Sequence, residues 1–107
     1  ANMRSKVKIV CFDGEPETLK NLGDGNVDVT IVQKPFEFGR LSVKLLNEVK
    51  KANGDIQKAI EALKPELEKL GMKIKPGNII DTGVTIVTPE NAKAFLDDLK
   101  KKGQTST

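Results

Sequence analysis

Two short runs of apolar residues near the N-terminus predict β-strands. Residues 6–12 (Lys-Val-Lys-Ile-Val-Cys-Phe) begin with alternating polar and apolar positions and end in a continuous apolar run. This pattern is typical of a strand that enters a sheet covered on both faces. Residues 27–32 (Val-Asp-Val-Thr-Ile-Val) are rich in β-branched side chains and predict a second strand.

A short helix is predicted between these two strands. Pro16 suits the first helical position, and Leu19 and Leu22 provide a narrow apolar face. The Gly-Asp-Gly-Asn sequence at 23–26 ends this helix with residues that favour turns. Strand, helix and strand together predict a right-handed crossover that places two parallel strands side by side.

Apolar residues recur at helical spacing in two longer segments. After Pro35 the apolar stripe comprises Phe38, Leu41, Leu45, Leu46 and Val49. The second helical pattern begins at Asp55, the expected N-cap, and ends at Gly71. Pro65 lies inside this pattern, so we expect it to kink or split the helix near Lys64.

The C-terminal part of the chain predicts further strand structure and a last helix. Residues 78–82 and 84–87 indicate either one strand interrupted at Gly83 or two short strands, with a bend or crossing point at the glycine. Thr88 and Pro89 then suit the cap and the first position of a helix. Alternating strands and helices predict an α/β fold with a parallel sheet and flanking helices.

The composition is that of an ordinary folded protein. The 107 residues are 37% hydrophobic and 31% charged. No segment approaches the roughly 20 consecutive apolar residues that a membrane-spanning helix needs. The first residues lack the apolar core of a signal peptide, an observation that leaves the compartment open.

Several kinds of chemistry are not expected because the residues they need are missing. The sequence has no histidine, which removes the histidine-dependent triads and imidazole metal sites. The single cysteine, Cys11, lies in an apolar run and is expected to be a buried, inert thiol. There is no phosphate-binding loop. We therefore expect no enzyme, no metal and no cofactor.

Nucleic-acid binding is not expected either. The formal net charge of +3 comes from lysines that are spread along the chain and interleaved with acidic residues. Trp and Tyr are absent, so the stacking platforms of single-strand binders are missing.

Two polar residues at the ends of predicted strands are the candidate site. Asp13 follows the first strand and Gln33 closes the second. If these strands are parallel neighbours, both side chains emerge at the sheet edge where open α/β sheets bind ligands. A carboxylate beside an amide suits the hydroxyls of a neutral polyol. From spacing alone, the more frequent alternative stays open: a turn residue or helix cap at Asp13 and a loop residue at Gln33 that bind no ligand.

The order of these segments resembles a known family. Residues 7–14 (VKIVCFDG) and 29–33 (VTIVQ), together with 38–39 and 42–46, 80–84 and 87–91, resemble the ribose- and glucose-binding proteins of bacterial ABC importers. These are type I periplasmic binding proteins. The resemblance covers nearly the whole chain except 53–75, where this sequence carries an additional helical insert.

The resemblance implies a solute-binding component of a sugar transporter, with two α/β lobes that close on a monosaccharide, a pentose or hexose. It implies that Asp13 and Gln33 hydrogen-bond sugar hydroxyls. The positions where the chain would cross between lobes are Gln33, Lys34, Asp81, Thr82 and Gly83. It also implies an ABC permease as partner of the full-length form and a periplasmic or extracytoplasmic location.

Family members are much longer than this chain, so the resemblance implies that 1–107 is a single C-terminal fragment. Residues 6–33 and 84–102 would be C-terminal-lobe elements, and 35–82 would belong to or cross into the other lobe. The apolar stripe of the helix at 36–51 would then be uncovered unless an N-terminal portion, a second copy or a rearranged packing covers it.

Other functions remain alternatives. The effector-binding domain of a lactose-repressor-type regulator shares the architecture but carries a DNA-reading segment, which this sequence does not show. A truncated structural or interaction domain would bind no sugar of its own. An enzyme would have to rest on Asp13 and an unpaired lysine. The sequence does not predict which sugar is bound.

Overall fold

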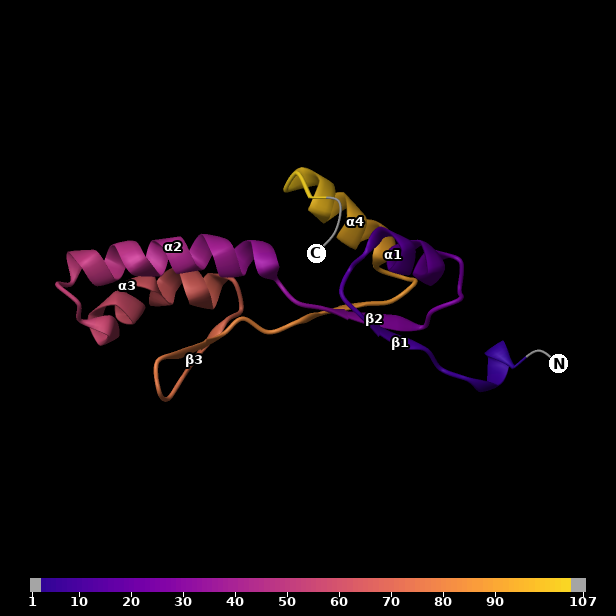
Figure 1. The fold of residues 1–107 in the computed structure, drawn as a ribbon, viewed down its shortest axis with the longest axis horizontal. Coiled ribbons are helices and arrows are strands. Elements are labelled where there is room, and N and C mark those ends of the chain that lie inside the picture. The colour runs from indigo at the N-terminus through magenta and orange to yellow at the C-terminus, as the bar shows by residue number, and fades with distance from the viewer. Residues whose placement is uncertain (1–2, 105–107) are drawn as a thin grey trace. The chain divides into compact units, whose positions relative to one another are not determined.

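The structure is a computed structural model that describes residues 3–104 (Figure 1). The described elements are η1 (Arg4–Lys6), β1 (Val10–Phe12), α1 (Pro16–Gly23), β2 (Val29–Val32), α2 (Pro35–Lys51), α3 (Ile56–Lys69), β3 (Lys73–Lys75), β4 (Ile79–Asp81), β5 (Thr85–Val87) and α4 (Ala92–Lys101). They form two compact units. Unit 1 contains the residues up to Gln33 and those from Val84 onward, and unit 2 is Lys34–Gly83.

Unit 1 is built on a small mixed sheet in the order β1-β2-β5. The predicted strand–helix–strand arrangement is confirmed, because β1 and β2 are parallel neighbours joined through α1, which has Pro16 in its first turn. The expectation of a parallel sheet is wrong for β5, which runs antiparallel to β2. Parallel neighbours need a crossover. The chain instead returns from unit 2 directly beside the end of β2, where Val32 pairs with Thr85.

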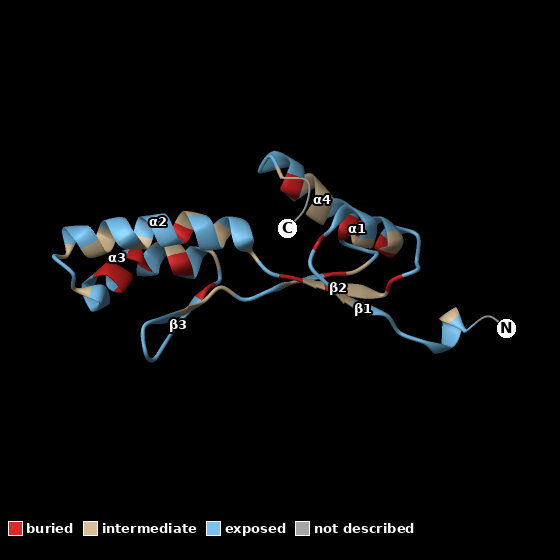
Figure 2. Cartoon of the chain, in the orientation of Figure 1, coloured by how far each residue is buried: buried red, intermediate tan, exposed pale blue. Residues whose placement is uncertain are grey.

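One face of this sheet carries the core of unit 1. The buried residues of this cluster are Leu19, Leu22, Val27, Val32, Val87, Ala92 and Leu99, with Cys11, Phe95 and Leu96 partly buried against them. Figure 2 shows buried positions in α1 and α4, and these belong to the same cluster as Val32 of β2 and Val87 of β5. Both helices of the unit therefore cover the same face. Cys11 is only partly buried, although the sequence predicted a buried thiol.

The other face of the sheet is open, contrary to the expectation that β1 is covered on both faces. The strand register places Phe12 beside Ile31 and Ile31 beside Ile86, on the face opposite buried Thr30. Phe12 is 71% exposed and Val10 is 54% exposed. We call this surface the open sheet face. It is open because α1 and α4 both pack on the opposite side.

The segment before β1 is tied to the start of β2 by Asp28. The carboxylate of Asp28 accepts a hydrogen bond from the backbone N–H of Ile9 at 2.8 Å. Arg4 lies 3.1 Å and Lys8 3.4 Å from the same carboxylate. The hydrogen bond from Ile9, with smaller contributions from Lys8 and Arg4, lowers the pKa of Asp28.

Unit 2 consists of the helix pair α2 and α3 and a hairpin of β3 and β4. Figure 1 shows α2 and α3 side by side. Their shared core contains the buried residues Leu41, Leu63, Leu67 and Met72, with Leu45, Leu70 and Ile80 partly buried against it. The predicted N-cap of α3 is confirmed, because the Asp55 carboxylate accepts a hydrogen bond from the N–H of Lys58 at 3.1 Å.

The apolar stripe of α2 is covered only in part. Leu41 is buried and Leu45 is half-buried, whereas Leu46 is 69% exposed. The covering surface comes from α3 and from Ile80 of β4. The sequence analysis raised an N-terminal portion, a second copy or a rearranged packing as possible covers. Packing within the chain covers the centre of the stripe but not its margin.

Pro65 does not split α3, which runs unbroken from Ile56 to Lys69. A proline inside a helix removes the hydrogen bond to the carbonyl of the residue four positions earlier. Pro65 and that residue, Glu61, are both exposed, so water can satisfy the carbonyl.

The last helix begins later than Thr88 and Pro89 predicted. α4 starts at Ala92, with Asn91 as its N-cap residue. The Asn91 side chain accepts the N–H of Thr88 at 2.8 Å and donates to the carbonyl of Ile86 at 3.0 Å. These bonds fold 88–91 into a turn that precedes the helix.

The C-terminal strand prediction resolves into two short strands, β4 and β5, which lie in different sheets. Between them Gly83 has φ 66°, a conformation in which most other residues are strained. The units change at Gln33–Lys34 and at Gly83–Val84. That the two units belong to different lobes of a binding protein stays a prediction. Within residues 3–104, no helix has the length and apolar character needed to cross a membrane.

Candidate functional site

Asp13 and Gln33 leave the sheet of unit 1 at the same edge. Asp13 follows β1 and Gln33 follows β2, and the two strands run parallel with Phe12 opposite Ile31. The carboxyl ends of both strands therefore meet at this edge, where ligands bind in open α/β sheets. Both residues are exposed.

The backbone of Asp13 adopts a left-handed conformation with φ 68°. For a residue with a Cβ atom this conformation costs roughly 1–2 kcal/mol. Two hydrogen bonds from β2 hold it. The N–H of Asp13 donates to the carbonyl of Ile31 at 2.9 Å, and its carbonyl accepts the hydroxyl of Thr30 at 2.7 Å. A strained backbone that is secured in this way is a common property of functional sites.

The polar ends of both side chains are available to a ligand. Within residues 3–104, neither the carboxylate of Asp13 nor the amide of Gln33 makes a hydrogen bond or an ion pair. Asp13 is not the cap of α1, because the N-cap position is Glu15. The helix-cap alternative is therefore wrong, and the alternative of a turn residue that binds no ligand stays open. The role of the two side chains in binding stays a prediction.

The other predicted crossing residues lie at the ends of unit 2. Asp81 accepts the N–H of Gly83 at 3.0 Å and forms an ion pair with Lys75 at 2.5 Å. The hydrogen bond from Lys75 is the main cause that lowers the pKa of Asp81, and the bond from Gly83 adds to it. A Cβ atom added at Gly83 would lie 3.9 Å from Nζ of Lys34, so the two ends of unit 2 are near each other.

Thr82 lines a groove of about 270 Å³ together with Phe38, Ser42, Asn78 and three aliphatic residues. Two of its polar groups already make hydrogen bonds. The Ser42 hydroxyl donates to the carbonyl of Phe38 at 2.6 Å, and the side-chain oxygen of Asn78 accepts from Gln57 at 2.7 Å. The Thr82 hydroxyl and the Asn78 side-chain nitrogen make no hydrogen bond within residues 3–104, so the polar side chains of this groove are only partly engaged.

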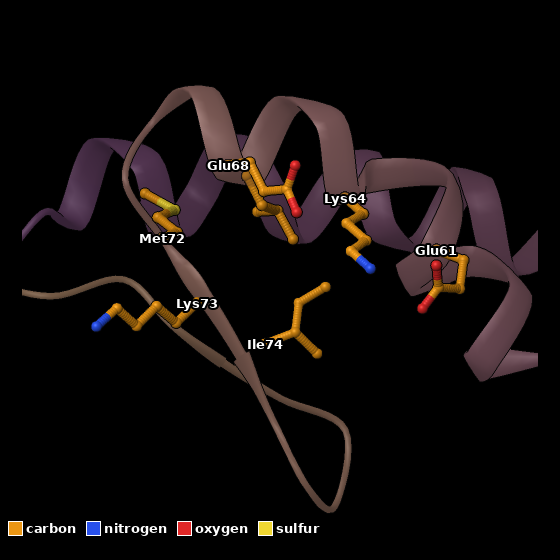
Figure 3. A pocket seen from close by; sticks show the side chains of 7 residues that line it. Glu61, Lys64, Glu68, Met72, Lys73 and Ile74 are labelled. Carbon is orange, nitrogen blue, oxygen red and sulfur yellow. The ribbon is translucent and has the colours of Figure 1, made fainter.

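A larger groove, of about 480 Å³, lies between α3 and β3 (Figure 3). Leu67 and Met72 are its buried residues, and its remaining lining residues are Glu61, Lys64, Glu68, Lys73 and Ile74. This groove is not predicted by the sequence. The groove forms because β3 folds back against α3. No pattern of residues in the sequence predicts the contact between these two elements.

Charged residues also tie α2 to α3. Glu66 of α3 pairs with Arg40 and, at 2.8 Å, with Lys44, both on α2. Arg40 additionally pairs with Glu37 at 2.6 Å. Hydrogen bonds from Lys44 and then Arg40 lower the pKa of Glu66. This network joins the helices and leaves these groups satisfied, so we assign it a structural role.

Metal-binding clusters are not seen in the described part of the chain, where no three His, Cys, Asp or Glu residues could hold an ion together. No family model matches this sequence, and no curated protein is significantly similar to it. The structure shows a mixed α/β protein with a small three-stranded sheet and a two-stranded hairpin.

Proposed function

We propose that this chain is part of a solute-binding component of an ABC sugar importer, in which Asp13 and Gln33 hydrogen-bond the hydroxyls of a monosaccharide. The observation that carries the proposal is the pair itself. A carboxylate and an amide, neither engaged within residues 3–104, stand at the carboxyl edge of two parallel strands. The resemblance of the surrounding segments to ribose- and glucose-binding proteins supplies the ligand class.

The chemistry of the two groups fits a neutral polyol. A carboxylate accepts hydrogen bonds, and an amide both donates and accepts them, as sugar hydroxyls do. Hydrogen bonds to a charged group are the stronger kind, at about 1.5–3 kcal/mol each. The backbone of Asp13 is already held by hydrogen bonds to β2, so it loses little freedom when a sugar binds.

The two units are consistent in outline with a protein that closes around its ligand. The chain passes from unit 1 to unit 2 after Gln33 and returns after Gly83. In the proposed function these passages are the crossings between lobes, and a permease receives the sugar from the closed form. An extracytoplasmic location belongs to the same proposal.

Affinity for the 107-residue chain is expected to be low, because enclosure and several convergent polar groups are needed for tight binding. Two polar ligands give a dissociation constant of about 1 mM or weaker. A longer chain that places an N-terminal lobe before this segment is expected to bind much more tightly.

Titration calorimetry of both chains against pentoses and hexoses tests the proposal. Submicromolar binding by the short chain would contradict the expected weakness of the isolated segment. An affinity that Asp13→Ala leaves unchanged in the longer chain would refute the assignment of the site. Glu15→Ala is a matched control, since this neighbouring carboxylate is also exposed but lies one position beyond Gly14.

The open sheet face favours one alternative, an interaction domain with no sugar binding of its own. Phe12 is 71% exposed there, next to Val10 and Ile86, which are 54% and 48% exposed, and neighbouring exposed apolar side chains are typical of interaction surfaces. The same titrations distinguish the two functions, since an interaction domain shows no response to any sugar.

A further inference from the structure

Thr30 is an unusual residue for its place in the fold. It lies in the central strand of unit 1, paired with Cys11 on one side and Val87 on the other. Its exposed fraction is 0%, and among residues 3–104 it is the one polar side chain that is buried. A valine has nearly the same shape and would bury no hydroxyl. The hydroxyl of Thr30 therefore needs a physical reason.

The reason is the contact that the hydroxyl makes. Burying a hydroxyl without a partner is costly, and Thr30 meets this requirement by donating to the carbonyl of Asp13 at 2.7 Å. Asp13 lies seventeen positions earlier in the chain, so the bond is not a local turn. It links the interior of β2 to the strained residue that follows β1.

Together with the bond from the Asp13 N–H to the carbonyl of Ile31, this contact holds Asp13 from both sides of its Cα atom. One bond fixes the peptide before Asp13 and the other fixes the peptide after it. Both partners belong to β2. Since φ and ψ of Asp13 lie between these two peptides, the bonds restrain the direction in which its carboxylate leaves the sheet.

We propose that Thr30 is a positioning residue: its buried hydroxyl keeps Asp13 in the left-handed conformation that presents the carboxylate to the ligand. Gln33 follows the same strand. One strand therefore sets the positions of both ligand-binding groups, Gln33 through the chain itself and Asp13 through Thr30. That Asp13 is presented to a ligand rests on the proposed function. That Thr30 holds the conformation of Asp13 does not.

Three substitutions test whether the Thr30 hydroxyl positions Asp13 or merely finds a hydrogen-bond partner for itself. Thr30→Val removes the donor and keeps the shape, and Thr30→Ser keeps the donor and removes a methyl group. Thr85→Val is the matched control, because Thr85 lies in the adjacent strand β5 and its hydroxyl makes no hydrogen bond within residues 3–104. Thermal unfolding followed by circular dichroism identifies a temperature at which all variants are folded.

The first measurement needs no sugar. Amide hydrogen exchange by NMR reports the opening of the bond between Asp13 N–H and Ile31. Thr30→Val is expected to speed exchange of the Asp13 amide by about tenfold, with Thr30→Ser within about threefold of the original chain and Thr85→Val unchanged. Equal exchange in Thr30→Val and the original chain refutes the inference. So does a serine variant that exchanges as fast as the valine variant.

The second measurement follows ribose and glucose titrations by NMR, using the Asp13 backbone amide and the Gln33 side-chain amide. Thr30→Val is expected to weaken binding by about tenfold, and Thr30→Ser to restore most of the affinity. If the valine variant binds as well as the original chain, the positioning role is wrong and the proposed function stands. If the original chain and a lobe-completed longer chain bind no sugar, the proposed function fails, and the exchange result alone decides whether Thr30 holds Asp13.

Discussion

Leu67 is the residue whose truncation tests the core of unit 2 most directly. It lies in α3, is 0% exposed, and belongs to the cluster with Leu41, Leu63 and Met72 that joins the two helices. Leu67→Ala removes most of its side chain from the centre of this cluster. Leu46→Ala is the matched control, because Leu46 is on α2 but 69% exposed.

The expected cost follows from burial. Removing the outer carbons of a buried leucine loses about 2 kcal/mol of transfer free energy at ~0.8 kcal/mol per CH₂ group. The cavity left behind raises the total to about 3 kcal/mol. Leu67 also lines the groove between α3 and β3, so neighbouring side chains can relax into part of the space. This places the cost near the lower end of the range for such changes. The control should change stability by no more than about 0.5 kcal/mol.

Urea unfolding followed by far-ultraviolet circular dichroism measures the difference. The chain has no Trp or Tyr, so intrinsic fluorescence is a poor probe. The helical signal reports mainly unit 2, because α2 and α3 have 17 and 14 residues against 8 in α1 and 10 in α4. If Leu67→Ala and Leu46→Ala differ by less than about 1 kcal/mol, the α2–α3 core does not hold unit 2 together as described.

Three further predictions concern charge, surface and backbone. Because folding lowers the pKa of Asp28, its stabilising contribution is present above its unfolded pKa of about 3.9 and is lost as pH falls through the lower folded value. Urea midpoints of Asp28→Asn and the original chain should therefore differ most near neutral pH and converge below about pH 4; a constant difference would contradict the sign. Phe12→Ser should reduce self-association in sedimentation velocity, and a purely monomeric original chain would show that the open sheet face does not drive association. Gly83→Ala should cost at least about 1 kcal/mol in urea unfolding because φ is 66°, whereas Gly39→Ala, inside α2, should stabilise; equal effects would refute the strain argument.

Features set by local chemistry could be predicted from the sequence. The turn at 23–26 and the two apolar runs at 6–12 and 27–32 predicted the β1–α1–β2 unit, because each depends on residues close together in the chain. Asp55 was recognised as a cap for the same reason, since its carboxylate bonds an N–H three positions later. The meeting of Asp13 and Gln33 at one sheet edge followed from the parallel pairing of their strands.

Features set by distant contacts could not be predicted. The continuous apolar run of β1 is typical of a strand buried on both faces, yet which faces are covered depends on where α1 and α4 pack. The antiparallel direction of β5 depends on the path of unit 2 rather than on its own residues. Thr88 is a good cap residue, yet α4 begins only at Ala92, after a turn in which the Asn91 side chain bonds Thr88 and Ile86. The bond from Thr30 to Asp13 likewise joins residues that no sequence pattern connects.

The pairing of β2 with β5 gives unit 1 a simple topology. Val32, the last residue of β2, is opposite Thr85, the first residue of β5, so the chain leaves and re-enters the ladder at the same end. Unit 2 therefore occupies the position of the loop in a β-hairpin formed by β2 and β5. Such a long insertion is tolerated because the entropy cost of closing a loop rises only slowly with its length. Replacing Lys34–Gly83 with a two-residue Asn-Gly turn is expected to join the strands directly. The product would be a minimal protein that presents Asp13 and Gln33 on their own sheet edge without the intervening helices.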